Sequence, residues 1–279
     1  MTITSSTPPP PRLGFIGGGN MARSLIGGLL QHGFAADSIC VAEPHVDART
    51  TLTRDFGVVA TSDNLAVASP ADVLVLAVKP QVMKEVCTGL RDAIGHAPLL
   101  ISIAAGVRSG QMDGWLGGGR AIVRAMPNTP ALIGAGATAL YANPAVTADQ
   151  RGQAEYILAS TGLVRWVEDE AVMDTVTALS GSGPAYFFAL VEALEDAAVA
   201  QGLPRDTARA LAAQTCLGAG RMLTESGDAP AELRRRVTSP GGTTAAALAS
   251  FEQDHLTAIT ARAVAAATRR GAELSAALD

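Results

Sequence analysis

Strand-like and helix-like segments alternate along the first 168 residues of the chain. Short apolar runs such as VLVLAV are separated by stretches in which apolar residues recur at helical spacing, as Met21, Leu25 and Leu29 do. Continuous apolar runs of this length suit parallel strands that are covered by helices on both faces. The pattern predicts an α/β fold with an N-terminal, Rossmann-type doubly wound sheet over residues 12–168.

The character of the chain changes after LVRWVED, residues 163–169. No further strand-like run follows, and the remainder is rich in alanine and leucine with Gly-Pro breaks at GSGP, GLP, SGDAP and SPGG. Residues 169–279 are therefore predicted to form an all-helical domain of five helices. Residues 1–11 contain four consecutive prolines, and we expect them to be a disordered leader with no place in either domain.

Composition excludes several classes of function. A net charge of −5 argues against a nucleic-acid partner or an anionic membrane surface, because both require a basic face. No apolar run is long enough to span a membrane. The three cysteines, Cys40, Cys87 and Cys216, have neither the spacing of a metal site nor that of a disulfide framework. Together with the lack of a signal-peptide pattern, this predicts a cytoplasmic protein that binds no metal.

The segment GFIGGGNMA carries the first motif of a binding site, Gly17-x-Gly19-x-x-Ala22. It follows a predicted strand and precedes a predicted helix. In that position Gly17 permits a tight turn, Gly19 lets a pyrophosphate approach the backbone, and Ala22 allows close packing of helix on strand. The helix N-terminus adds the positive end of its dipole. The motif predicts a dinucleotide site, with a structural glycine turn as the alternative.

Two charged residues follow other predicted strands of the same domain. Glu43, in VAEPH, stands where a carboxylate usually binds the ribose hydroxyls of NAD and repels the 2′-phosphate of NADP. His45, Arg49 and Arg54 are near enough in sequence to bind that phosphate instead, and Glu43 could also be a solvated strand end. Lys79, in AVKP, ends the fourth strand, where it could meet ribose or phosphate or simply be exposed.

The helical half offers few groups that could donate a proton to a substrate. It contains no lysine, one histidine (His255, expected inside a helix) and one tyrosine (Tyr186). A carbonyl acceptor needs such a donor, whereas a cyclic iminium already carries its proton. The stretch SPGGTT, residues 239–244, combines hydroxyls with a predicted helix N-terminus that could bind a carboxylate. An ordinary helix N-cap explains the same residues equally well.

The motifs GFIGGGNMA, LAVKPQ, SIAAGV, RAMPNTPA, GATALYAN, ALSGSGPAYFF and VTSPGGTTAAALASFE occur in this order along the chain. In this the sequence resembles pyrroline-5-carboxylate reductases, from about residue 12 to residue 270. The resemblance implies a Rossmann domain, a helical domain that intertwines with a second subunit, and a homodimer often assembled into a decamer. It further implies reduction of the cyclic imine 1-pyrroline-5-carboxylate to L-proline with NADPH or NADH, the last step of proline biosynthesis.

The resemblance also implies roles for individual residues. The cofactor-binding residues would be Gly17, Gly18, Gly19, Asn20, Met21, Ala22, Glu43, Asn64, Ala77, Val78, Lys79, Pro80 and Asn128. The substrate-binding residues would be Ser239, Gly241, Gly242, Thr243 and Thr244. Thr244 would bind the ring nitrogen and Ser239 the carboxylate, so these two are the expected catalytic residues.

Three other functions are compatible with parts of this pattern. A β-hydroxyacid dehydrogenase would need a lysine in the helical half, which contains none. A reductase of a larger cyclic imine could use the same donors, and a nucleotide-binding regulator would bind the cofactor without turnover. One departure bears on the cofactor: position 43 is Glu, where some family members carry a small hydroxyl residue suited to a 2′-phosphate.

Overall fold

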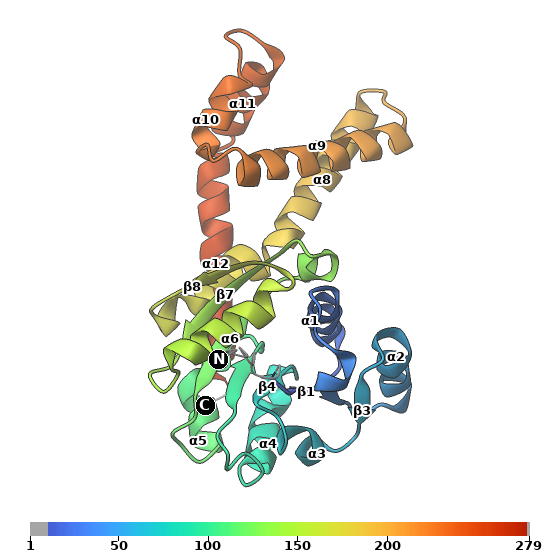
Figure 1. Cartoon of the computed structure of the whole chain (residues 1–279). Coiled ribbons are helices and arrows are strands. Elements are labelled where there is room, and N and C mark those ends of the chain that lie inside the picture. The colour runs from blue at the N-terminus through green and yellow to red at the C-terminus, as the bar shows by residue number, and fades with distance from the viewer. Residues whose placement is uncertain (1–10, 278–279) are drawn as a thin grey trace, which may run out of the picture. The chain divides into compact units, whose positions relative to one another are not determined.

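The computed structural model describes residues 11–277 of the chain, so the Pro-rich leader lies outside the described residues except for Pro11. By compactness the chain divides into two units (Figure 1). The first contains the residues up to Gly181 together with those from Ala267 onward, and the second contains Ser182–Ala266. The functional boundary expected near residue 168 stays a prediction.

The first unit is built on one eight-stranded sheet with the strand order β3-β2-β1-β4-β5-β6-β7-β8. Its strands are β1 (Leu13–Ile16), β2 (Ile39–Ala42), β3 (Val59–Thr61), β4 (Val73–Leu76), β5 (Leu99–Ser102), β6 (Ile122–Met126), β7 (Gly136–Ala142) and β8 (Gly162–Trp166). The predicted run VLVLAV contains β4, β8 overlaps LVRWVED, and no strand follows within residues 169–277. The doubly wound Rossmann-type sheet is thereby confirmed.

Two strands, β7 and β8, run against the other six. β7 pairs antiparallel with β6, whereas every other neighbouring pair is parallel. The connection between them, residues 127–135, holds only the 3₁₀ helix η2 (Thr129–Ile133). A parallel crossover needs a dozen or more residues, so a link this short returns the chain in the opposite direction.

Helices cover both faces of the sheet in the first unit (Figure 1). One face packs against α1 (Asn20–Gln31), α2 (Val46–Phe56) and α6 (Ala148–Ala159). The other packs against α3 (Asn64–Ala68), α4 (Pro80–Leu90) and α5 (Ser109–Trp115). The remaining short helices of this unit are η1 (Ala36–Ser38), η3 (Glu170–Val172), α7 (Met173–Val176) and the π-helical turn η4 (Thr177–Gly181).

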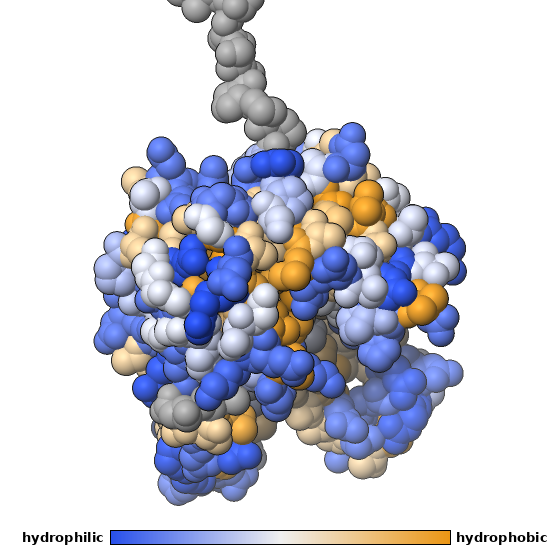
Figure 2. Space-filling model, turned by 90° about the horizontal axis from the view of Figure 1, so that it is seen from below, coloured by the Kyte–Doolittle hydropathy of each residue, from blue (hydrophilic) through white to orange (hydrophobic). Residues whose placement is uncertain are grey.

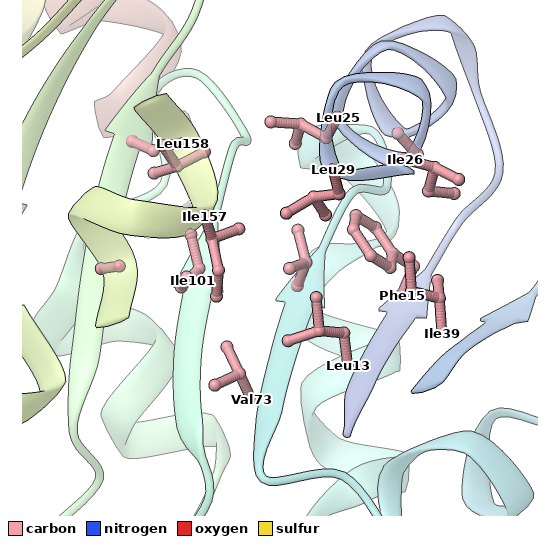
Figure 3. Packing of buried hydrophobic residues seen from close by; sticks show 14 of the residues in the cluster. Leu13, Phe15, Leu25, Ile26, Leu29, Ile39, Val73, Ile101, Ile157 and Leu158 are labelled. Atoms are coloured by element: carbon pink, nitrogen blue, oxygen red, sulfur yellow. The ribbon is translucent and has the colours of Figure 1, made fainter. Parts of the chain in front are cut away.

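Alternation along each strand divides the core into two clusters. In β1, Leu13 and Phe15 point to the cluster under α1, while Ile16 points to the cluster under α4. Figure 3 shows Leu25 and Leu29 of α1 facing Leu13 and Phe15 across the first of these interfaces. Each strand of this kind buries apolar side chains on both faces, which is why it reads as a continuous apolar run.

The second unit is helical. It contains α8 (Gly183–Ala200), α9 (Arg205–Glu225), α10 (Pro230–Arg236), α11 (Thr243–Gln253) and the first part of α12 (Leu256–Ala276). α8 and α9 pack against each other, and Glu195 of α8 is buried between Arg205 and Arg209 of α9 at 2.8 and 3.0 Å. The two guanidinium groups, Arg209 above all, lower the pKa of the Glu195 carboxyl.

One expectation for this region is wrong. His255 does not lie inside a helix: it has φ = +55° and separates α11 from α12. Neither Gly nor Pro marks the break, which explains why the predicted pattern runs through it. Histidine adopts the left-handed conformation more readily than most residues, and His255 takes it directly after Asp254, the C-cap of α11.

Candidate active site

The predicted cofactor residues gather at the carboxyl edge of the sheet. The chain runs from β1 outward to β2 and β3, then returns to β4 on the other side of β1. The strand order therefore reverses between β1 and β4, and doubly wound sheets bind ligands at such a point. The turn after β1 carries Gly17–Gly19, and the turn after β4 carries Ala77–Lys79, so both flank this position.

Each of the three glycines in the turn after β1 lies in a different structural environment. Gly17 has φ = +99°, and a Cβ there would lie 2.6 Å from the Ala77 carbonyl oxygen. A Cβ on Gly18 would lie 2.6 Å from Leu52 of α2. Gly19 has φ = −69°, and no atom lies within 4 Å of a Cβ built on it. The backbone thus requires glycine at 17, a side chain at 18 would have to displace Leu52, and at 19 the space is open for a ligand.

The helix after this turn begins without a side-chain cap. Gly19 is the N-cap of α1, no side chain accepts a hydrogen bond from the first turn, and that turn holds no acidic residue. Its backbone N–H groups and the positive end of the helix dipole are therefore available to an anion. Asn20 and Met21 lie in this exposed first turn, and Ala22 is buried against the sheet. These features fit the pyrophosphate of a dinucleotide.

Glu43 follows β2 and is bound to the glycine turn. Its Oε2 accepts a hydrogen bond from Gly18 N–H at 3.0 Å, and its Oε1 accepts one from His45 N–H at 3.0 Å. The side chain is buried. Glu43 is therefore not a solvated strand end.

Asn64 is placed at the start of α3, after β3. Asp63 caps this helix, with its Oδ1 accepting from the N–H of Leu65 at 2.8 Å. Asn64 itself is half-buried and lines a hollow of about 580 Å³ with residues of α4, among them Glu85 and Val86. Its role beside an adenosine remains a prediction.

The turn after β4 lies directly against the turn after β1. Ala77 N–H donates to Ile16 O at 2.8 Å, and the Ala77 carbonyl and Val78 side chain stand over Gly17. Lys79 is the N-cap of α4 and is exposed, and Pro80 is the first helical residue. Proline suits that position because its missing N–H would have had no partner there.

Asn128 has a structural role in addition to the predicted one. Its Nδ2 donates to the Ser180 carbonyl at 3.0 Å, and its Oδ1 accepts from Ala137 N–H at 2.9 Å. The buried amide thus ties the end of β6 to β7 and to the π-helical turn. A direct contact between Asn128 and a cofactor stays a prediction.

The predicted substrate residues lie in the helical unit, at the start of α11. Gly241 has φ = +70°, which a residue with a side chain adopts only under strain, and Gly242 is the N-cap of the helix. Gly242 N–H donates to Ser239 O at 3.0 Å, closing the turn. No side chain caps α11, and no acidic residue stands in its first turn. The N–H groups at Thr243 and Thr244 are thus available to a carboxylate.

Two of the three arginines before this turn pair with neighbouring acids. Arg235 binds Glu232 at 2.7 Å, and Arg236 binds Asp228 at 2.6 Å and Glu232 at 3.0 Å. Ser239 and Thr243 are exposed and Thr244 is half-buried. The turn therefore combines backbone donors with hydroxyls that solvent or a substrate can reach.

Leu52 supports the glycine turn, a role that its position in the sequence does not reveal. It is buried in α2 and stands directly beneath Gly18. Helical spacing marks it as a core residue, but nothing in the sequence indicates which turn it touches. Among the described residues, no group of three or more His, Cys, Asp or Glu side chains could hold a metal ion. Within residues 11–277 we also find no helix with the length and apolarity needed to cross a membrane.

Two family models match the chain. Residues 12–106 match the model described as "NADP oxidoreductase coenzyme F420-dependent", and residues 170–274 match "Pyrroline-5-carboxylate reductase dimerisation". Among curated proteins, pyrroline-5-carboxylate reductase from Pseudomonas aeruginosa is 49% identical over 95% of this chain and 97% of its own. The enzyme of that name from Arabidopsis thaliana is 39% identical over 95% of both chains.

The chain belongs to the pyrroline-5-carboxylate reductase family. Solved structures of the family agree with the fold. The reductase from Coxiella burnetii has a TM-score of 0.92 and 45% identity, covering 95% of this chain and 98% of its own. The Plasmodium falciparum enzyme, solved with NADP bound, has a TM-score of 0.84 and 30% identity over the same shares. The family consists of NAD(P)-dependent oxidoreductases, as the resemblance implies.

Proposed function

We propose that this protein reduces 1-pyrroline-5-carboxylate to L-proline with NADPH or NADH, the last step of proline biosynthesis. The observation that carries the proposal is the extent of the family match, with 49% identity to a curated relative over 95% of the chain. The geometry of two uncapped helix N-termini, one after a glycine turn and one after SPGG, supports it.

The first unit would hold the cofactor. The N-terminus of α1 binds the pyrophosphate over Gly18–Met21, with Gly17 and Ala22 keeping the backbone close to the sheet. Glu43 and Asn64 lie toward the adenosine, and Ala77–Pro80 with Asn128 border the nicotinamide. When bound, the nicotinamide supplies a hydride.

The helical unit would hold the substrate. Ser239 and the backbone of Gly241, Gly242 and Thr243 receive the carboxylate at the start of α11, and the Thr244 hydroxyl hydrogen-bonds the ring nitrogen. The hydride forms a bond to the imine carbon while the C=N electron pair moves to nitrogen. An imine that enters protonated needs no acid from the protein, which agrees with the lack of lysine in residues 169–279.

The functional domains in this proposal are 12–168 for the cofactor and 169–279 for substrate and dimerisation. The match of residues 170–274 to a dimerisation model supports a homodimer, and a decamer of five such dimers is the larger assembly we propose. The protein would act in the cytoplasm on a small molecule, without nucleic acid or membrane as partner.

A steady-state assay tests this function. Purified protein is mixed with NADH or NADPH and with either the five-membered imine carboxylate or its six-membered homologue. We expect cofactor oxidation with proline as product, and a higher kcat/KM for the five-membered ring. Absence of turnover with both imines contradicts the function, and faster turnover of the larger ring reassigns the substrate.

A further inference from the structure

The carboxylate of Glu43 is held in place by the glycine turn. It lies at the carboxyl end of β2, beside the turn that follows β1, and is buried. Gly18 N–H binds one oxygen and His45 N–H the other, each at 3.0 Å. A side chain with both oxygens bound to backbone cannot turn away from an incoming ligand without breaking these bonds. Glu43 therefore presents its negative charge at a fixed place.

The absence of a side chain at Gly18 leaves room for the Glu43 carboxylate beside the turn. A Cβ on Gly18 would lie 3.4 Å from Glu43 Oε2 and 2.6 Å from Leu52. Each carboxylate oxygen has lone pairs beyond the one that its N–H donor uses. Glu43 can thus accept one further hydrogen bond while it holds the turn, and a sugar hydroxyl can donate such a bond.

The arginines that could offset this charge are already partnered. Arg49 donates through Nη1 to the carbonyl oxygens of Glu43 and Pro44, at 2.7 and 2.8 Å. Arg54 and Arg23 both bind Asp55, at 2.9 and 2.6 Å. A 2′-phosphate near Glu43 would meet a fixed carboxylate, and each of these guanidinium groups is already oriented by an oxygen acceptor elsewhere.

We propose that Glu43 makes this protein select NADH over NADPH, and that the same carboxylate positions the glycine turn. It accepts a hydrogen bond from the adenosine ribose of NADH and repels the 2′-phosphate of NADPH. This inference rests on the proposed binding of a nicotinamide dinucleotide, and it deepens that proposal by choosing between the two forms. Glu43 is a specificity-determining residue in this account.

Equilibrium binding tests the selection without any imine. NADH and NADPH are titrated by calorimetry into the full-length wild type, Glu43→Gln, Glu43→Asp and Asp47→Asn. Asp47 is an exposed acid in the first turn of α2, so Asp47→Asn removes the same charge without touching the glycine turn. We expect the wild-type Kd for NADPH to exceed that for NADH by at least about tenfold, because like charges in contact are strongly disfavoured.

The variants distinguish an effect of the fixed Glu43 carboxylate from a general effect of negative charge near the site. Glu43→Gln should lower the ratio of the two Kd values several-fold, Glu43→Asp should largely keep it, and Asp47→Asn should leave it unchanged. Equal or tighter binding of NADPH by the wild type overturns the inference, as does an equal shift in Asp47→Asn or no binding of either dinucleotide. If the ratio holds but no imine is reduced, the proposed function fails and the selection stands.

Discussion

The two units of this chain bury their apolar side chains very differently. The first unit has a core on each face of its sheet, with Phe15, Leu25, Leu74 and many others inaccessible to solvent. In residues 182–266, only Gly183, Glu195, Ala208 and Leu233 are buried. The helical unit instead exposes large apolar side chains, among them Phe187, Phe188, Leu190, Leu211, Leu217, Met222, Leu223 and Phe251.

This difference indicates where each unit obtains its stability. A helical unit of this size without a core of its own cannot offset the entropy of folding from within one chain. The exposed residues recur along α8 and α9, on helices that match a dimerisation model. On the face shown in Figure 2, hydrophilic side chains predominate and apolar ones form smaller areas between them. We therefore expect the first unit to draw its stability from its own core and the helical unit to draw much of its stability from a second copy.

Truncation of a buried residue in the first unit should have the largest effect on stability. Phe15→Ala removes a ring that is fully buried between the sheet and α1, and the cost should be about 3–5 kcal/mol. Denaturant unfolding at two protein concentrations measures it. The matched variant Leu132→Ala, at a site of η2 in the same unit that is 61% exposed, should cost much less; an equal loss would contradict the role given to burial.

A charge on the apolar face of α8 should have the next largest effect, which is on self-association. Phe188 is 68% exposed in the chain, and Phe188→Asp should weaken self-association by about 2 kcal/mol or more, on the order of thirtyfold. Sedimentation velocity over a dilution series measures it. Val59→Asp makes the same change on the exposed edge strand of the first unit and serves as the control. Unchanged association in Phe188→Asp would remove α8 from the interface.

The third effect concerns the glycine turn. Gly19→Val adds a side chain where the protein leaves open space, so the fold should be retained while dinucleotide binding weakens by about 1–3 kcal/mol. Gly17→Ala should instead destabilise the fold itself, since its φ is +99° and its Cβ would strike the Ala77 carbonyl. Thermal unfolding and NADH titration distinguish the two, and full binding by Gly19→Val would contradict the role of the turn.

A smaller effect is expected in the helical unit at Thr244. Removal of its hydroxyl in Thr244→Ala should lower kcat by about fivefold, the equivalent of one hydrogen bond of about 1 kcal/mol, and leave the Kd of NADH unchanged. Thr260→Ala is the control, because that hydroxyl only bonds the Leu256 carbonyl of its own helix. Equal kinetics for both variants would refute the role of Thr244.

The smallest effect should come from an ion pair at the edge of the first unit. The Arg12 side chain and backbone N–H lower the pKa of the Asp72 carboxyl, so this pair stabilises the fold above the unfolded-state value of about 3.9. The stabilisation is lost as the pH falls through the lower, folded-state pKa. Because both side chains are substantially exposed, Asp72→Asn should cost at most about 1 kcal/mol at neutral pH.

Urea unfolding of wild type and Asp72→Asn across the acid range provides the measurement. The difference in the free energy of unfolding should shrink toward zero as Asp72 becomes protonated in the wild type. A difference that grows at low pH would have the wrong sign for a carboxyl with a lowered pKa.

Most of the first unit could be predicted because its strands are buried on both faces. Apolar runs as short as VLVLAV suit a buried strand better than a helix. The glycine turn follows one such run directly. The antiparallel β7 could not be read from its own residues, since strand direction depends on the link before it. The break at Asp254-His255 also escaped prediction, because residues with ordinary helix propensity there adopt a turn.

The site was predictable in its position and less so in its contacts. Gly19 and SPGG were expected to leave helix N-termini free, and both helices begin without a side-chain cap. The sequence could not show that both Glu43 oxygens bind backbone N–H groups, or that Asn128 ties β6 to β7. Such contacts depend on side-chain direction, which position along the chain does not determine.

The fate of a labelled hydride tests the proposed function most directly. Protein and 1-pyrroline-5-carboxylate are incubated with NADH that carries deuterium at both C4 positions of the dihydronicotinamide ring, and the product is analysed by mass spectrometry and NMR. We expect proline with one deuterium on the ring carbon that was the imine carbon. Unlabelled proline, or oxidation of NADH without proline, would contradict it.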